Sequence, residues 1–162
     1  MFTLVEVVGV RIEMPSNQPI VLLKEREGRT FLPIWVGSAE ATAIAFAQQE
    51  LKAQRPLTHD LIVELLAATS TTLYAIHITE MRDGIFYAEL MMKNESGTLA
   101  PLSVRPSDAI AIALRTKTNI LVSQDLLNSA GIEIPEPRAG ESEQEVEAFR
   151  EFLDQINPDD FA

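Results

Sequence analysis

One stretch of this sequence occurs twice. Residues 98–115 read TLAPLSVRPSDAIAIALR, and residues 30–47 read TFLPIWVGSAEATAIAFA. Laid over each other without a gap, the copies share a threonine, a proline, a valine, an isoleucine and three alanines, and acidic Glu40 lies over acidic Asp108. Each copy predicts a short strand that turns into a helix. An internal repeat constrains the fold strongly, because both halves of the chain are then expected to build the same supersecondary unit.

Hydrophobic periodicity extends the repeat to a unit of three strands and two helices. Alternating apolar residues and turn signals predict strands at 2–13, 20–27, 30–36, 72–81, 85–93 and up to residue 104. Helical spacing predicts helices from 38 to about 53 and from 59 to about 69, with counterparts in the second half. Ser38 and Thr58 are predicted to cap the first two helices, and Leu61, Leu65, Leu66 and Ala68 to form the apolar face of the second. The predicted fold class is α+β, an internally duplicated unit with mostly antiparallel strands and a further C-terminal helix.

The two pseudo-repeats, about 1–70 and 71–132, are predicted to form one domain over residues 1–135. Residues 135–140, PEPRAG, read as a linker. After the linker, Ser142 and Glu145 have the spacing of a capping box, and apolar residues at helical spacing predict an amphipathic helix at about 142–156. Residues 136–162 are therefore interpreted as an acidic C-terminal extension.

Composition limits the class of protein. The chain has 162 residues and no cysteine, which excludes disulfides, thiol catalysis and cysteine-rich zinc sites and agrees with a reducing compartment. It has no apolar run of membrane-spanning length and no cleavable signal pattern, so we expect a cytoplasmic protein with no membrane partner. The net charge of −11 argues against a general basic surface for nucleic acid, although the acidic excess gathers after Glu133 and leaves room for a local basic cleft.

The repeat separates architectural residues from candidates for chemistry. Acids that occur in both copies, such as Glu40 and Asp108, stand near predicted helix starts, where the helix dipole and free backbone amides stabilise a negative charge. An architectural role is therefore the first interpretation of these acids. Residues that only one copy carries are better candidates for chemistry, and they are His59, Arg55-Pro56, Arg105-Pro106 and Ser107.

The two Arg-Pro pairs indicate an anion site. Arg55 and Arg105 each stand just before a predicted helix start, where free amides and a guanidinium together suit a phosphate. His59 is a candidate general base or metal ligand, and the alternative is a first-turn residue that faces solvent. His77 lies in an apolar strand and is interpreted as structural.

Four segments resemble a known family. Residues 32–45 (LPIWVGSAEATAIA), 55–62 (RPLTHDLI), 84–90 (GIFYAEL) and 105–115 (RPSDAIAIALR) are similar, in the same order, to the bifunctional nuclease domain family of bacteria and plants. The resemblance covers nearly all of residues 1–135, and the acidic tail looks like that of actinobacterial members.

This resemblance implies a metal-assisted phosphodiesterase that acts on RNA, DNA or both, with Mg²⁺ or Mn²⁺ as the metal. It also implies a homo-oligomer, a dimer or a trimer. The implied site residues are His59, Asp60 and Asp108 for catalysis, Arg55, Arg105 and Ser107 for phosphate binding, and Glu40, Asp60 and Asp108 as metal ligands.

A non-catalytic function remains as the alternative. In this interpretation the protein is an oligomer that binds a small anion or a protein partner, and the Arg-Pro and acidic residues form helix caps and ion pairs. The negative net charge favours this alternative, as does the lack of a D-x-D or H-N-H metal motif in the sequence.

Overall fold

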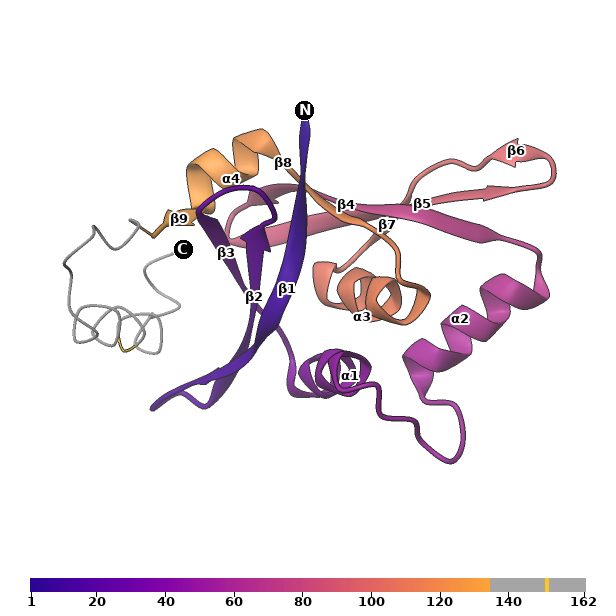
Figure 1. The fold of residues 1–162 in the computed structure, drawn as a ribbon, viewed down its shortest axis with the longest axis horizontal. Helices are drawn as coiled ribbons and strands as arrows, with labels where there is room; N and C mark the ends of the chain where they lie inside the picture. The colour runs from indigo at the N-terminus through magenta and orange to yellow at the C-terminus, as the bar shows by residue number, and fades with distance from the viewer. Residues whose placement is uncertain (135–150, 152–162) are drawn as a thin grey trace.

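The computed structural model describes residues 1–134 and residue 151 (Figure 1). The first half contains β1 (Phe2–Glu13), β2 (Gln18–Glu25), β3 (Thr30–Trp35), α1 (Ser38–Gln48) and α2 (Thr58–Ala68). The second half contains β4 (Thr72–Arg82), β5 (Ile85–Asn94), β6 (Gly97–Thr98), β7 (Leu102–Val104), α3 (Pro106–Thr116), β8 (Ile120–Ser123), α4 (Gln124–Ala130) and β9 (Ile132–Glu133). The α+β class is confirmed.

The two halves follow the same order up to their first helix. In the second half the third strand is divided into β6 and β7 around Pro101, and β8 is added between the two helices. The duplication itself stays a prediction. The predicted C-terminal helix at about 142–156 lies outside the described residues except for Glu151, which is helical. Every helix within the described residues is too short or too polar to span a bilayer.

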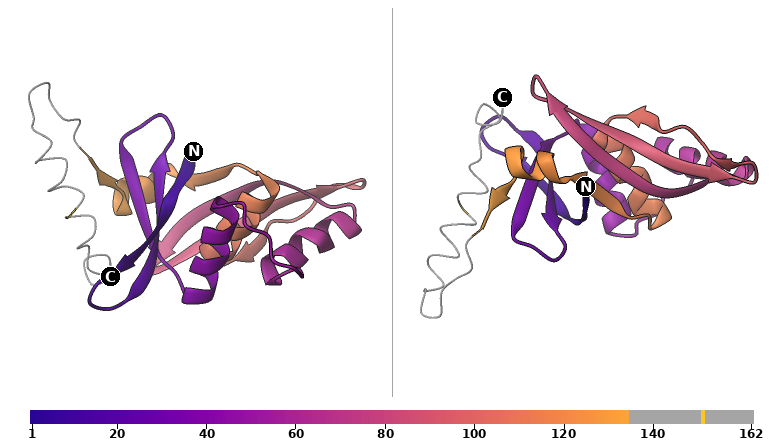
Figure 2. Two further views of the ribbon diagram at one scale, coloured as in Figure 1. Left: turned by 60° about the horizontal axis from the view of Figure 1, so that its bottom comes forward. Right: turned by 90° about the horizontal axis from the view of Figure 1, so that it is seen from above.

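One sheet joins both halves, with the strand order β6-β5-β4-β8-β1-β2-β3-β9 and β7 paired to β5. Every pairing is antiparallel except that of β4 with β8. β8 therefore forms the seam between the halves, since it pairs with β1 on one side and β4 on the other. The sheet twists so strongly that β1, β2 and β3 run across the direction of β4 and β5 (Figures 1 and 2).

Helix α3 is the centre of the core. Its residues from Ala109 to Ala113 are all buried, and the alternation of alanine with Ile110 and Ile112 lets neighbouring elements approach closely. α1, α2, β4 and β5 contact it, and α4 packs on the other side of the sheet (Figure 1). Replacing either buried isoleucine by alanine is expected to cost about 2–5 kcal/mol of stability.

Helix α2 packs in an unusual way. Its one fully buried residue is His59, and Leu61 and Leu65 are 58% and 59% exposed. Ile62 and Leu66 contact the core instead. The predicted apolar face is therefore wrong for Leu61 and Leu65 and right for Leu66. The sequence carries apolar residues on two faces of α2, and only tertiary packing decides which face is inside.

The starts of α1 and α2 differ by one residue from the predicted caps. Gly37 and Leu57 occupy the N-cap positions, and Ser38 and Thr58 are the first helical residues. The side chain of Asp60 then acts as the capping group, because its Oδ2 accepts the Leu57 amide at 3.0 Å. α1 ends at Gln48 rather than near residue 53, just before Glu50 adopts a left-handed φ of 53°.

Candidate functional site

The first turns of α1, α2 and α3 bring four side chains together. Glu40 is in the first turn of α1, His59 is the second residue of α2, Asp108 is in the first turn of α3, and Arg105 is the N-cap of α3. We call these four residues the Arg105 cluster. Its members come from distant parts of the chain, and α3 places two of them because its proline at the first helical position fixes where the helix begins.

A continuous chain of polar contacts links the Arg105 cluster. Arg105 Nη2 donates to Glu40 Oε1 at 2.8 Å, and Arg105 Nε donates to Asp108 Oδ2 at 2.8 Å. The other oxygen of Asp108, Oδ1, lies 2.9 Å from His59 Nε2. The Asp108 carboxylate therefore holds the arginine with one oxygen and the histidine with the other.

The charges of this cluster are well defined at neutral pH. Burial acts to raise the pKa of Asp108, but hydrogen bonds from Arg105 and His59 outweigh it, so the pKa lies below its usual value. The hydrogen bond to Asp108 in turn raises the pKa of Arg105. Asp108 is therefore an anion and Arg105 a cation throughout the physiological range.

This ionisation assigns the tautomer of His59. An ionised Asp108 can only accept a hydrogen bond, so the Nε2 atom of His59 carries the proton and Nδ1 has a free lone pair. Nδ1 has no hydrogen-bond partner among the described residues, and no fully buried side-chain nitrogen or oxygen there lacks one. Nδ1 therefore contacts solvent although His59 as a whole is only 8% exposed. A carboxylate-oriented imidazole with one accessible nitrogen can accept or donate a proton near neutral pH.

Asp60 belongs to a second cluster at the other end of α3. Its Oδ1 accepts from Arg115 Nε at 2.7 Å, and Arg115 Nη1 donates to the carbonyls of Ala43 at 3.0 Å and Ala111 at 2.8 Å. We call Asp60, Arg115 and these two carbonyls the Arg115 cluster. The hydrogen bonds from Arg115 and the Leu57 amide lower the pKa of Asp60. Arg115 thus ties α1, α2 and α3 together.

The carboxylates of Glu40, Asp60 and Asp108 do not form a common metal site in this geometry. Within the described residues, no group of three or more histidine, aspartate or glutamate side chains is arranged to hold a metal ion. Glu40 and Asp108 are both engaged by Arg105, and Asp60 is engaged by Arg115. Metal binding by these three residues stays a prediction, and the donor set does not fit a shared ion as it stands.

The two remaining sequence candidates lie in different places. Arg55 is exposed in the loop before α2 and makes no hydrogen bond or ion pair with other described residues. Ser107 is buried in the first turn of α3, beside Arg105. The structure therefore brings Arg105, Asp108 and His59 into contact and places Ser107 next to them, while Asp60 and Arg55 lie outside this group of contacts.

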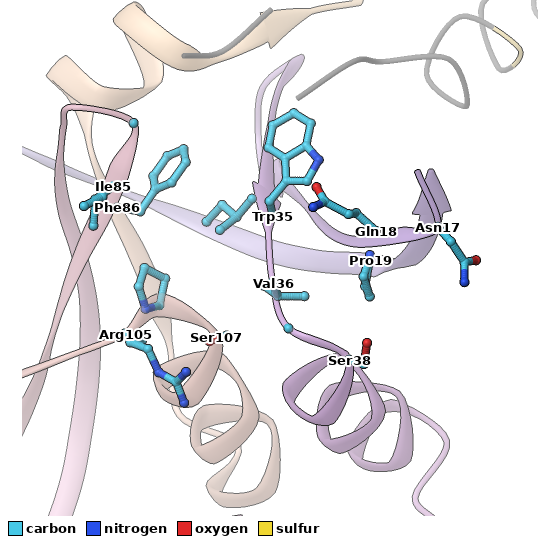
Figure 3. Close-up of a pocket in the computed structure, with 14 residues that line it drawn as sticks. Asn17, Gln18, Pro19, Trp35, Val36, Ser38, Ile85, Phe86, Arg105 and Ser107 are labelled. Atoms are coloured by element: carbon cyan, nitrogen blue, oxygen red, sulfur yellow. The ribbon is translucent and has the colours of Figure 1, made fainter. Parts of the chain in front are cut away.

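A pocket of about 660 Å³ opens beside Arg105 (Figure 3). Its walls come from the starts of α1 and α3, the ends of β3, the β4–β5 turn and the β1–β2 turn. The residues that line it include Gln18, Trp35, Ser38, Phe86, Arg105 and Ser107. Arg105 belongs both to the pocket wall and to the cluster with His59, so the two features adjoin at this residue.

Sequence reasoning missed Arg115 and the aromatic wall of the pocket. Arg115 closes the segment RPSDAIAIALR, and a basic residue in the last turn of a helix is commonly read as a partner of the helix dipole. Its partner Asp60 could not be read from spacing. Trp35, the one tryptophan of the chain, lies at the end of a strand just before a helix start. That position could have indicated that Trp35 lines a binding site.

Comparisons with known proteins identify the family of this chain. The bifunctional nuclease domain family matches residues 21–135. An uncharacterized protein of Mycobacterium tuberculosis strain H37Rv is 46% identical over 162 residues, which cover 97% of this chain and 96% of that protein. Bifunctional nuclease 1 of Oryza sativa subsp. japonica is 28% identical over 147 residues, which cover 89% of this chain and 44% of the rice protein. Since the family match spans more than half of its length, this chain belongs to the bifunctional nuclease domain family.

Proposed function

We propose that the protein is a nuclease that hydrolyses phosphodiester bonds of RNA, DNA or both at the Arg105 cluster, in the cytoplasm. The observation that carries the proposal is the placement of His59. Helix α2 leaves Leu61 and Leu65 exposed and buries a histidine, which contacts Asp108 beside Arg105. A helix gains more stability by burying leucine than histidine, so this arrangement favours a role in chemistry.

Arg105 is the proposed phosphate-binding residue. Its Nε and Nη2 atoms hold Asp108 and Glu40, and its side chain is 66% exposed, which leaves Nη1 for a ligand. The amides of Ser107 and Asp108, in the first turn of α3, have no partner within the helix. A guanidinium and two free amides at a helix start form an anion site for the scissile phosphate.

His59 is the proposed general base. Its Nδ1 takes a proton from a water molecule, or from a ribose 2′-hydroxyl in RNA, as that oxygen attacks the phosphorus. The bond from phosphorus to the leaving oxygen then breaks, and the proton on Nδ1 can neutralise that oxygen. Asp108 orients the ring through its contact with Nε2. Positioned proton transfer of this kind contributes about 10²–10⁴-fold to a rate.

The test is cleavage of single-stranded RNA and DNA by purified protein, with Mg²⁺, with Mn²⁺ and with EDTA. His59→Ala and Asp108→Asn are each expected to lower the rate by at least about 10²-fold. His77→Gln is the matched control. His77 lies in β4 and stacks on Phe2 of β1, with ring centroids 4.2 Å apart, so this variant is expected to keep wild-type activity. Equal activity of all four proteins would contradict the assignment. A rate unchanged by EDTA would contradict the expected Mg²⁺ or Mn²⁺ assistance.

The alternative is a non-catalytic oligomer that binds a small anion or a protein partner. Two observations favour it: Arg105 is already neutralised by two carboxylates, and α2 exposes an apolar face at Leu57, Leu61 and Leu65. The expected homo-oligomer, a dimer or a trimer, is common to both proposals. Light scattering of the full chain measures it, and the double variant L61S/L65S is expected to dissociate the oligomer if this face forms the contact. An unchanged mass would assign the contact elsewhere.

A further inference from the structure

The pocket beside Arg105 has two aromatic walls. Trp35 stands at the end of β3, and Phe86 stands near the start of β5, so the two rings enter from different strands (Figure 3). Trp35 Nε1 donates to Glu13 Oε2 at 3.4 Å, which helps to fix the orientation of the indole. Gln18 and Asn17 add amide groups to the rim. Flat apolar walls with amide groups at the edge suit a planar heterocycle that can form hydrogen bonds.

The pocket wall also holds a serine hydroxyl that has no partner among the described residues. Three polar or charged residues of the described chain are buried, namely Glu13, His59 and Ser107. Glu13 accepts from Ser16 and Trp35, and His59 contacts Asp108, but the Ser107 hydroxyl makes no hydrogen bond with another described residue. Ser107 is only 7% exposed and lines the pocket. Because no fully buried oxygen in this part of the chain lacks a partner, its hydroxyl opens toward the pocket.

We propose that this pocket binds one nucleobase of a single-stranded nucleic acid, with the adjoining phosphate at Arg105 and Ser107. The inference rests on the proposed nuclease function and names its substrate class. A volume of about 660 Å³ lies within the usual range of ligand pockets and accommodates a base with its sugar. Arg105 connects the base pocket to His59, so a base bound here delivers a neighbouring phosphodiester to the imidazole.

The charge of the protein explains why a base pocket is needed. Acidic residues outnumber basic ones even before the acidic C-terminal extension, so the protein offers little general basic surface for phosphates and gains from contacts that do not depend on charge. Stacking on an aromatic ring does not depend on charge and is available to every base. A base must leave its duplex to enter the pocket, and the enzyme therefore selects single strands or unpaired loops.

The fluorescence of Trp35 reports on binding in the pocket, because Trp35 is the one tryptophan of the chain. The fluorescence of the full-length protein is titrated with AMP, GMP, CMP and UMP, and with ribose 5-phosphate and inorganic phosphate as controls. Saturable quenching by nucleotides, absent with ribose 5-phosphate, is the expected result. Phe86→Ala is expected to raise the Kd for nucleotides about 10-fold, while Phe86→Tyr keeps the ring and the affinity. Ser107→Ala is expected to weaken the binding of nucleotides more than the binding of free nucleosides.

The inference is overturned if ribose 5-phosphate quenches as strongly as AMP, if no nucleotide gives a saturable change, or if Phe86→Ala binds as well as wild type. Calorimetry on a Trp35→Phe variant, which retains an aromatic ring, keeps the test independent of the fluorophore. Nucleotide binding without cleavage by the wild type would reject the nuclease proposal and leave the base pocket intact. Cleavage that depends on His59 without nucleotide binding would reject the pocket and leave the nuclease proposal intact.

Discussion

The two ends of α3 carry the same pair of groups in opposite settings. At the start of the helix Arg105 Nε donates to Asp108 at 2.8 Å, and at its end Arg115 Nε donates to Asp60 at 2.7 Å. The Arg105 side chain is 66% exposed, whereas that of Arg115 is 11% exposed. Arg115 also donates to two backbone carbonyls, while Arg105 borders a pocket and reaches a histidine through Asp108.

This difference separates an arginine that stabilises the fold from an arginine that can bind a ligand. A buried guanidinium whose Nε and Nη1 atoms hold a carboxylate and backbone carbonyls of two helices can release these acceptors only by breaking the packing. An exposed guanidinium with a donor directed at solvent can take a phosphate at small cost. Proximity to an aspartate is therefore a poor guide to function in this protein, and the exposure of the arginine side chain is a better one.

The largest expected effect comes from removing Arg115. Arg115→Ala leaves the Asp60 carboxylate without its cation and two carbonyls without their donor, so we expect a loss of about 3 kcal/mol in the free energy of unfolding. Urea denaturation followed by circular dichroism measures the loss. Arg115→Lys keeps the charge but cannot serve all three acceptors, and an intermediate value is expected. A stability equal to wild type in Arg115→Ala would show that the two ends of α3 are equivalent.

Arg105→Ala is expected to give the opposite profile. Its side chain is 66% exposed, although those of Glu40 and Asp108 are only 15% and 23% exposed, so the free energy of unfolding should fall by about 1 kcal/mol. The rate of phosphodiester cleavage should fall about 10–100-fold, because the proposed phosphate ligand is lost. Arg105→Lys tests whether a point charge is sufficient. The comparison fails if Arg105→Ala destabilises the protein as much as Arg115→Ala does.

Acid titration should act on the Arg115 cluster through Asp60. Its folded pKa lies below the unfolded value of about 3.9, so its contribution to stability is present above that pH and is lost as pH falls through the folded pKa. We expect Asp60→Asn to differ most from wild type at pH 7 and to converge with it below about pH 4. The pH-dependent part should be under about 1 kcal/mol, since a third of the side chain is exposed.

The control for this titration is Asp83→Asn. Asp83 lies in the β4–β5 turn with a left-handed φ of 52°, which asparagine also tolerates. The Asp83 side chain makes no hydrogen bond or ion pair with other described residues, so this variant reports the effect of removing a surface carboxylate alone. Urea denaturation at several pH values measures both variants. A difference for Asp60→Asn that grows as pH falls would have the wrong sign and would reject the assignment.

Hydrophobic periodicity and turn residues predicted the helices and strands well, because each of these elements has a local sequence pattern. β1 has the predicted bounds, and the Asp83-Gly84 turn joins two strands as expected. The Arg105 cluster was predicted in part, since Arg105, His59 and Asp108 were all candidates. Their meeting depends on how three helix starts converge, which spacing along the chain does not encode.

The pairing of Asp60 with Arg115 lay beyond local pattern for the same reason. Asp60 was grouped with Glu40 and Asp108 because all three are acids near helix starts, yet only the latter two share a partner. The orientation of α2 decides which arginine pairs with Asp60. Because α2 has apolar residues on two faces, its orientation could not be predicted from the sequence. A helix with one apolar face would have fixed it from the sequence.

The smallest expected effect, Glu40→Gln, sharpens the comparison at the Arg105 end. Glu40 Oε1 accepts from Arg105 Nη2 and offsets the charge that would attract a phosphate, so the neutral variant should bind nucleotides about 2–5-fold more tightly. The same change tests the metal prediction. If Glu40 were a metal ligand, removing its charge would weaken metal-dependent cleavage instead of tightening binding. Nucleotide titration and a cleavage assay on this one variant therefore distinguish phosphate binding by Arg105 from metal binding by Glu40.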